Sequence, residues 1–168
     1  MSVWMSEKEF RDANPAAAGV TINVPFLQEI KQDNEFRHLL GQVHQRLAAN
    51  PPMSARAAAE QLGQLRDQLE TYFALEEFYG YFKNSAITNP SISHQATSLK
   101  HEHESLFLQF NEIVDTSEQI VYHECSHNVT VKQLAAKLAV FCQALEKHEQ
   151  LEMELMLRMC NEDLGVGD

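Results

Sequence analysis

The stretch from residue 129 to residue 160 carries a stripe of side chains whose spacing alternates between four and three residues. The stripe runs through Leu134, Leu138, Phe141, Leu145, His148, Glu152 and Leu155. Positions spaced in this way share one face of an α-helix, the face that a helix in a bundle buries. The spacing therefore predicts a long helix packed against other helices, with a histidine and a glutamate on its buried face.

Three other stretches are predicted to form long helices, because prolines and short polar links separate them. Together with the last helix, the predicted ranges are 24–48, 54–83, 91–119 and 129–160. Ser54 and Ser91 follow prolines and are predicted to cap the second and third helices. Links of this length join antiparallel neighbours. The sequence thus predicts an all-α fold, an up-down-up-down antiparallel four-helix bundle with an N-terminal arm.

The predicted organisation is an arm at 1–21, one bundle domain at 22–160 and an acidic C-terminal tail at 161–168. A chain of 168 residues fits one domain with its own core. Charged residues 7–9 stand where a signal peptide needs an apolar run, so a cytoplasmic location is expected. The three cysteines are expected to be free thiols in that setting.

Acidic residues outnumber basic ones, 24 against 13, which gives a formal net charge of -11. A chain of this charge repels phosphate backbones and anionic membrane surfaces. Nucleic acid and membrane are therefore excluded as expected partners, and the sequence does not identify a protein partner.

Polar residues also interrupt the apolar stripes of the other three helices. Asp33 lies on the seam of the first helix, Glu76 on that of the second and His103 on that of the third. Each residue alone could be a hydrogen-bonded core residue, but an uncompensated buried carboxylate is costly. Facing helices of a bundle build metal sites from carboxylates and imidazoles. The joint pattern of these three with His148 and Glu152 predicts a metal site in the bundle core.

Three segments resemble the hemerythrin-like, or HHE cation-binding, family. Residues 72–77, Tyr-Phe-Ala-Leu-Glu-Glu, look like the family's HF-x-x-EE box with tyrosine in place of histidine. Glu102-His103 and residues 148–152, His-Glu-Gln-Leu-Glu, are similar to its third-helix and fourth-helix motifs. The resemblance covers about residues 26–157, which is nearly the whole chain.

The resemblance implies a non-haem iron or di-iron centre that binds or senses dioxygen, nitric oxide or iron. Glu76 and Glu152 would be bridging carboxylates and His103 and His148 terminal ligands, with Tyr72 and Asp33 completing the site. The cofactor would be one or two iron ions, with manganese as the other metal. A small diatomic ligand would be the partner. The alternatives are a metal-free helical interaction module with a decayed site and a di-iron oxidoreductase; binding is favoured over catalysis.

Two positions depart from the family pattern. On the first helix, counting from the upstream acidic residue selects Asn34 and counting back from the downstream apolar residues selects Asp33, which we favour because a carboxylate ligates better than an amide. On the second helix, Tyr72 stands where the family has histidine. Fewer imidazoles predict an oxygen-rich site that suits iron or manganese in higher oxidation states and holds as few as one ion. Reversible dioxygen carriage is correspondingly disfavoured.

Overall fold

The computed structural model describes the backbone of residues 24–79, 89–123 and 127–165. Side chains are described for 35–77, 89–122 and 131–158. The predicted N-terminal arm at 1–21 lies outside the described residues, as does the end of the acidic tail.

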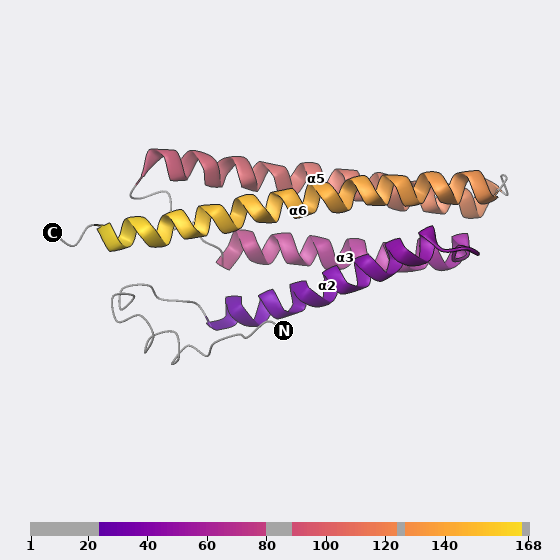
Figure 1. Ribbon diagram of the computed structural model, residues 1–168, viewed down its shortest axis with the longest axis horizontal. Helices are drawn as coiled ribbons and strands as arrows, with labels where there is room; N and C mark the ends of the chain where they lie inside the picture. The colour runs from indigo at the N-terminus through magenta and orange to yellow at the C-terminus, as the bar shows by residue number, and fades with distance from the viewer. Residues whose placement is uncertain (1–23, 80–88, 124–126, 166–168) are drawn as a thin grey trace.

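Within the described part of the chain, all regular structure is helical. The four helices are α2 (Val24–Ala48), α3 (Ala55–Tyr79), α5 (Pro90–His123) and α6 (His127–Gly165). They run alternately in opposite directions along one long axis (Figure 1). Each helix packs mainly against two neighbours, in the cyclic order α2, α3, α5, α6. The predicted all-α, up-down-up-down four-helix bundle is confirmed.

The helix bounds differ from the predicted ones at several ends. Helix α5 continues to His123 and α6 begins at His127, so most of the polar link expected between 119 and 129 is helical. Helix α6 also continues past residue 160, to Gly165. Assigned helix ends commonly differ from expected ones by one or two residues, and the polarity of this link does not prevent it from being helical.

The helix starts show which predicted caps form. Ser54 Oγ accepts a hydrogen bond from the backbone N–H of Ala57 at 3.3 Å, as expected of an N-cap. The predicted cap Ser91 was wrong: the side-chain oxygen of Asn89 accepts from the Ser91 N–H at 2.9 Å. The N-cap of α5 is therefore Asn89, which precedes Pro90. Proline has no backbone N–H, so at the first helical position it leaves no donor unsatisfied.

The buried stripes meet in two apolar clusters. The larger cluster fills the part of the bundle lined by all four helices and contains Phe110 of α5 and Phe141 of α6, whose ring centroids lie 4.8 Å apart. The smaller one consists of Ile92, Ala96, Leu99 and Leu155, from α5 and α6. In sequence, the polar residues His103, His148 and Glu152 fall between these two clusters. They therefore form a polar layer within an otherwise apolar core.

Replacing Phe141 with alanine is expected to lower the free energy of unfolding by about 3–5 kcal/mol, because it empties a ring-sized space in the core. The Phe141 side chain is 1% exposed. Its neighbour Val140 is 64% exposed, so Val140→Ala is the matched control and should change stability by less than about 0.5 kcal/mol. Urea unfolding followed by circular dichroism measures both. Equal effects would contradict the observed packing of α6.

No helix in the described residues is both long enough and apolar enough to cross a membrane.

Candidate metal centre

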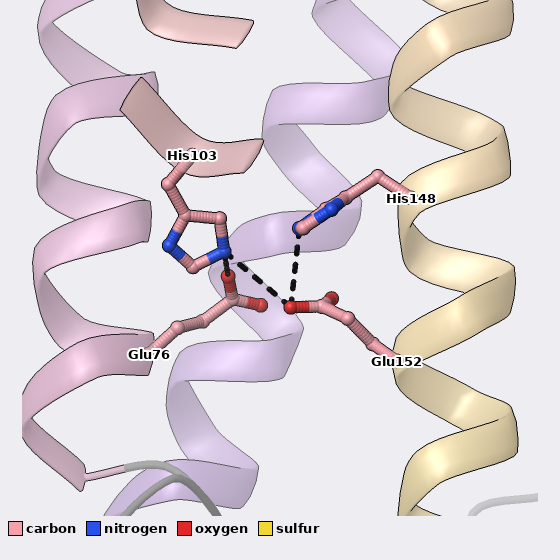
Figure 2. A group of neighbouring side chains, drawn as sticks. All are labelled: Glu76, His103, His148 and Glu152. Carbon is pink, nitrogen blue, oxygen red and sulfur yellow. Dashed lines mark hydrogen bonds and ion pairs between the residues drawn. The ribbon is translucent and has the colours of Figure 1, made fainter. Parts of the chain in front are cut away.

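Four polar side chains from three helices converge inside the polar layer. They are Glu76 of α3, His103 of α5, and His148 and Glu152 of α6, and they are 5%, 2%, 1% and 4% exposed. One ligand atom from each lies within 4.8 Å of every other. The side chains point toward a common centre (Figure 2). Four buried ligating groups thus form one cluster, which could hold a metal ion.

Glu152 stands at the middle of the cluster. Its Oε1 lies 3.4 Å from His103 Nε2 and 3.2 Å from His148 Nε2 (Figure 2). His103 Nε2 also lies 3.2 Å from Glu76 Oε2. Both imidazoles therefore direct the same ring nitrogen, Nε2, at the carboxylates.

Local helix geometry explains why these residues meet. His148 and Glu152 are one turn apart on α6, so they lie on the same face. Glu76 follows the buried Leu69 and Phe73 on the stripe of α3, and His103 lies between the buried Leu99 and Leu106 on that of α5. Because α5 lies between α3 and α6 in the bundle, its stripe brings His103 against both carboxylates.

The His103 imidazole is held in its protonated form when only protein groups surround it. Burial by itself lowers the pKa of His103, but the contacts of its ring with the Glu152 and Glu76 carboxylates outweigh burial and raise the pKa from 6.5 to about 9. The pKa of His148 is also raised: burial lowers it, but the hydrogen bond to Glu152 and the negative charge of that residue outweigh burial. A proton on His103 therefore balances part of the carboxylate charge at neutral pH.

Glu76 is the carboxylate that burial perturbs most clearly. Desolvation raises the pKa of Glu76 from 4.5 to about 7, with contacts to His103 opposing the rise and the charge of Glu152 adding to it. The Tyr72 hydroxyl also hydrogen-bonds to this carboxylate. Tyr72 is half-buried, so the structure places it beside the cluster, where it touches Glu76.

Two buried atoms of the cluster lack a hydrogen bond. Glu76 Oε2 and His148 Nε2 are both shielded from solvent, and neither has a partner with hydrogen-bond geometry. Glu76 Oε2 lies 3.2 Å from His103 Nε2, and His148 Nε2 lies 3.2 Å from Glu152 Oε1, so each atom has a polar neighbour within the cluster. Unsatisfied buried polar atoms are rare and costly in folded proteins. Ligation of one ion would satisfy both.

Phe73 closes one side of the cluster. Its ring stacks on His103, with centroids 4.3 Å apart and an interplanar angle of 9°, and it meets the edge of His148 at 6.2 Å. Phe73 is buried in the larger apolar cluster. The imidazoles are therefore fixed between an aromatic wall and the two carboxylates.

Two carboxylates outside the cluster contact the imidazoles from behind. Glu77 Oε1 lies 3.4 Å from His103 Nδ1 and also pairs with Lys100 through its other oxygen at 3.1 Å. Glu102 Oε2 lies 3.0 Å from His148 Nδ1. The sequence motifs include both residues, but the stripe pattern assigned them no role. The sequence feature that could have pointed to Glu77 and Glu102 is their position next to a buried residue, on the side of the helix that faces a neighbouring helix.

Some predicted site residues fall where the structure describes no side chains. Asp33 lies within α2, but its side chain is outside the described residues, and the same holds for Asn34. Of the six predicted ligands, the structure brings four together and places Tyr72 against Glu76. The side chain of Asp33 is not described.

No family model, no curated protein and no solved structure matches this chain.

Proposed function

We propose that this protein binds one transition-metal ion in its bundle core, with Glu76, His103, His148 and Glu152 as ligands. Imidazole and carboxylate ligands together suit iron and manganese, and iron is the metal we favour. Four donors about 2.0–2.2 Å from one ion lie roughly 3–4.4 Å from one another. The three closest contacts, of 3.2 and 3.4 Å, fall in this range, and all four ligand atoms lie within 4.8 Å of one another. The buried, unsatisfied Glu76 Oε2 and His148 Nε2 are the observation that carries the proposal.

A single ion is favoured over a di-iron centre. Among the side chains that the structure describes, this is the only group of three or more histidine, cysteine, aspartate or glutamate residues with metal-site spacing. Phe73 covers the imidazoles on one side, so the space there is apolar. The charges of Glu76 and Glu152 match those of one divalent ion.

The function that follows is binding or sensing, on the pattern of a divergent hemerythrin-like protein. Iron accepts up to six ligands, so four protein donors leave positions for dioxygen or nitric oxide. The antiparallel bundle and the location of the four ligands on its second, third and fourth helices support this assignment. When bound, the ion would supply the affinity for the diatomic ligand. The protein would supply the dry surroundings and the fixed imidazoles.

The rival function is a metal-free interaction module. Its support is the raised pKa of His103, because an imidazolium between Glu76 and Glu152 offsets their charge without any ion. The two proposals differ in what occupies the centre, a proton or a metal.

Elemental analysis of the purified protein separates them. The chain is expressed in iron-supplemented and manganese-supplemented media, purified without chelators, and its metal content is measured per chain. The expected result is close to one equivalent of iron or manganese, which is removed by a strong chelator and restored by adding the ion back. A chain that carries no metal from either medium, and takes up neither Fe²⁺ under anaerobic conditions nor Mn²⁺, would overturn metal binding and leave the interaction module.

A further inference from the structure

Each cluster histidine is held at both ring nitrogens. The Nε2 atoms of His103 and His148 face the cluster, while their Nδ1 atoms face Glu77 at 3.4 Å and Glu102 at 3.0 Å. Glu77 and Glu102 are not part of the cluster, and their side chains are 34% and 42% exposed. These two carboxylates therefore lie between the buried imidazoles and the surface.

A neutral imidazole carries one proton, and a ring nitrogen can ligate a metal only when the proton is on the other nitrogen. An ionised carboxylate only accepts hydrogen bonds, so it selects the tautomer with the proton on Nδ1. That tautomer leaves the Nε2 lone pair of each ring free toward Glu76 and Glu152. The outer carboxylates thus select the one tautomer in which both rings can ligate an ion at the centre.

The two contacts follow one another around the bundle. Glu77 on α3 reaches His103 on α5, and Glu102 on α5 reaches His148 on α6. Each glutamate is next in sequence to a cluster residue, Glu76 or His103, and a step of one residue turns it by about 100° toward the neighbouring helix. Lys100, on the exposed side of α5, pairs with Glu77 and holds its carboxylate in place. Helix α3 thus contacts the imidazole on α5, and α5 contacts the imidazole on α6.

We propose that Glu77 and Glu102 are positioning residues of the metal centre, which fix the tautomer and ring orientation of His103 and His148 and strengthen their binding to the ion. This proposal rests on the proposed metal-binding function. Carboxylate–histidine–metal arrangements are common in metalloproteins, and loss of the outer partner typically lowers metal affinity by about 10–100-fold.

The first test measures Zn²⁺ affinity by competition with a chromophoric chelator, because Zn²⁺ has no redox chemistry. Glu77→Gln and Glu102→Gln keep the shape of the side chain and remove its charge. Each is expected to weaken Zn²⁺ binding by about 10–100-fold. The matched controls are Glu70→Gln on α3 and Glu104→Gln on α5, which remove one charge from exposed positions of the same helices. They are expected to change affinity less than about twofold, because exposed charges are screened.

The second test asks whether each carboxylate acts on its own histidine. Long-range ¹⁵N–¹H NMR spectra of the Zn²⁺-loaded protein report which ring nitrogen carries the proton. In the unsubstituted chain, both rings are expected to carry it on Nδ1. Glu102→Gln should shift the Nδ1 proton of His148 upfield and leave that of His103 in place, while Glu77→Gln should do the reverse. A general loss of packing would move both rings together.

The outcomes separate this proposal from the function on which it rests. If the unsubstituted chain binds Zn²⁺ and both glutamine variants bind it as tightly as their controls, the positioning role is overturned and metal binding stands. Protons found on Nε2 in the loaded protein would overturn it as well. If the unsubstituted chain binds neither Zn²⁺ nor Fe²⁺ nor Mn²⁺, the metal-binding function falls, and the positioning role with it.

Discussion

Replacing Glu152 with glutamine is expected to reduce metal affinity by more than the roughly 100-fold that loss of an outer-shell partner costs. Glu152 Oε1 contacts both imidazoles, at 3.4 Å from His103 Nε2 and 3.2 Å from His148 Nε2. Glutamine has nearly the same shape, but an amide is a poor ligand and carries no charge to offset a cation. The substitution removes a donor and half of the inner carboxylate charge in one step.

Calorimetric titration with Mn²⁺, and with Fe²⁺ under anaerobic conditions, measures the loss. Glu154→Gln is the matched control, because Glu154 is on the same helix, two residues further along, and exposed. Its affinity should equal that of the unsubstituted chain. Circular dichroism should show unchanged helix content in both variants. A Glu152→Gln protein that still binds metal within tenfold of the control would show that the ion lies elsewhere.

Helical periodicity was sufficient to predict the inner cluster. Once the chain forms helices, spacings of three and four residues decide which side chains face the core. Glu76, His103, His148 and Glu152 occupy such positions, and all four are buried in one group. Their role as metal ligands stays a prediction, because periodicity shows burial and not what is bound.

Contacts between helices were beyond the reach of periodicity. Glu77 and Glu102 sit on helix flanks, and whether a flanking side chain meets a neighbour depends on the axial register of two helices. Register is set by packing of the whole core, so no local pattern contains it. The same limit left the first helix unresolved between Asp33 and Asn34, because its apolar seam is less regular than the other three.

The residue that caps a helix N-terminus was predicted correctly only where a single candidate was present. Ser54 had no rival and caps α3. At the start of α5, Asn89 and Ser91 both flank Pro90, and the asparagine is the observed cap. The start of a helix thus depends on small differences between such competitors, which local sequence does not resolve.

The metal-free protein is expected to lose stability as the pH rises, and a bound ion is expected to reverse the trend. Glu76 has a pKa of about 7 in the fold against 4.5 ordinarily, and His103 about 9 against 6.5. Both pKa values are raised, so the folded chain holds protons that the unfolded chain releases. Their stabilising effect is complete below the unfolded pKa and is lost as the pH passes the folded one. Between about pH 6 and pH 9 the free energy of unfolding should fall by on the order of 3 kcal/mol.

A divalent ion must displace these protons, so its affinity rises with pH, in the opposite direction. Saturating Mn²⁺ should therefore raise Tm more at about pH 8 than at about pH 6, with a gain near 2.7 kcal/mol when the ion is at about 100 times its Kd. Thermal unfolding at both pH values, with and without Mn²⁺, measures the effect. Glu76→Gln is the informative variant: it removes the part of the pH slope that lies below about pH 7 and, because Glu76 also raises the pKa of His103, reduces the part above it. Glu104→Gln should leave the whole slope unchanged. A metal-free protein whose stability rises over this range, or an Mn²⁺ gain that is equal at both pH values, would show that the cluster does not hold these protons.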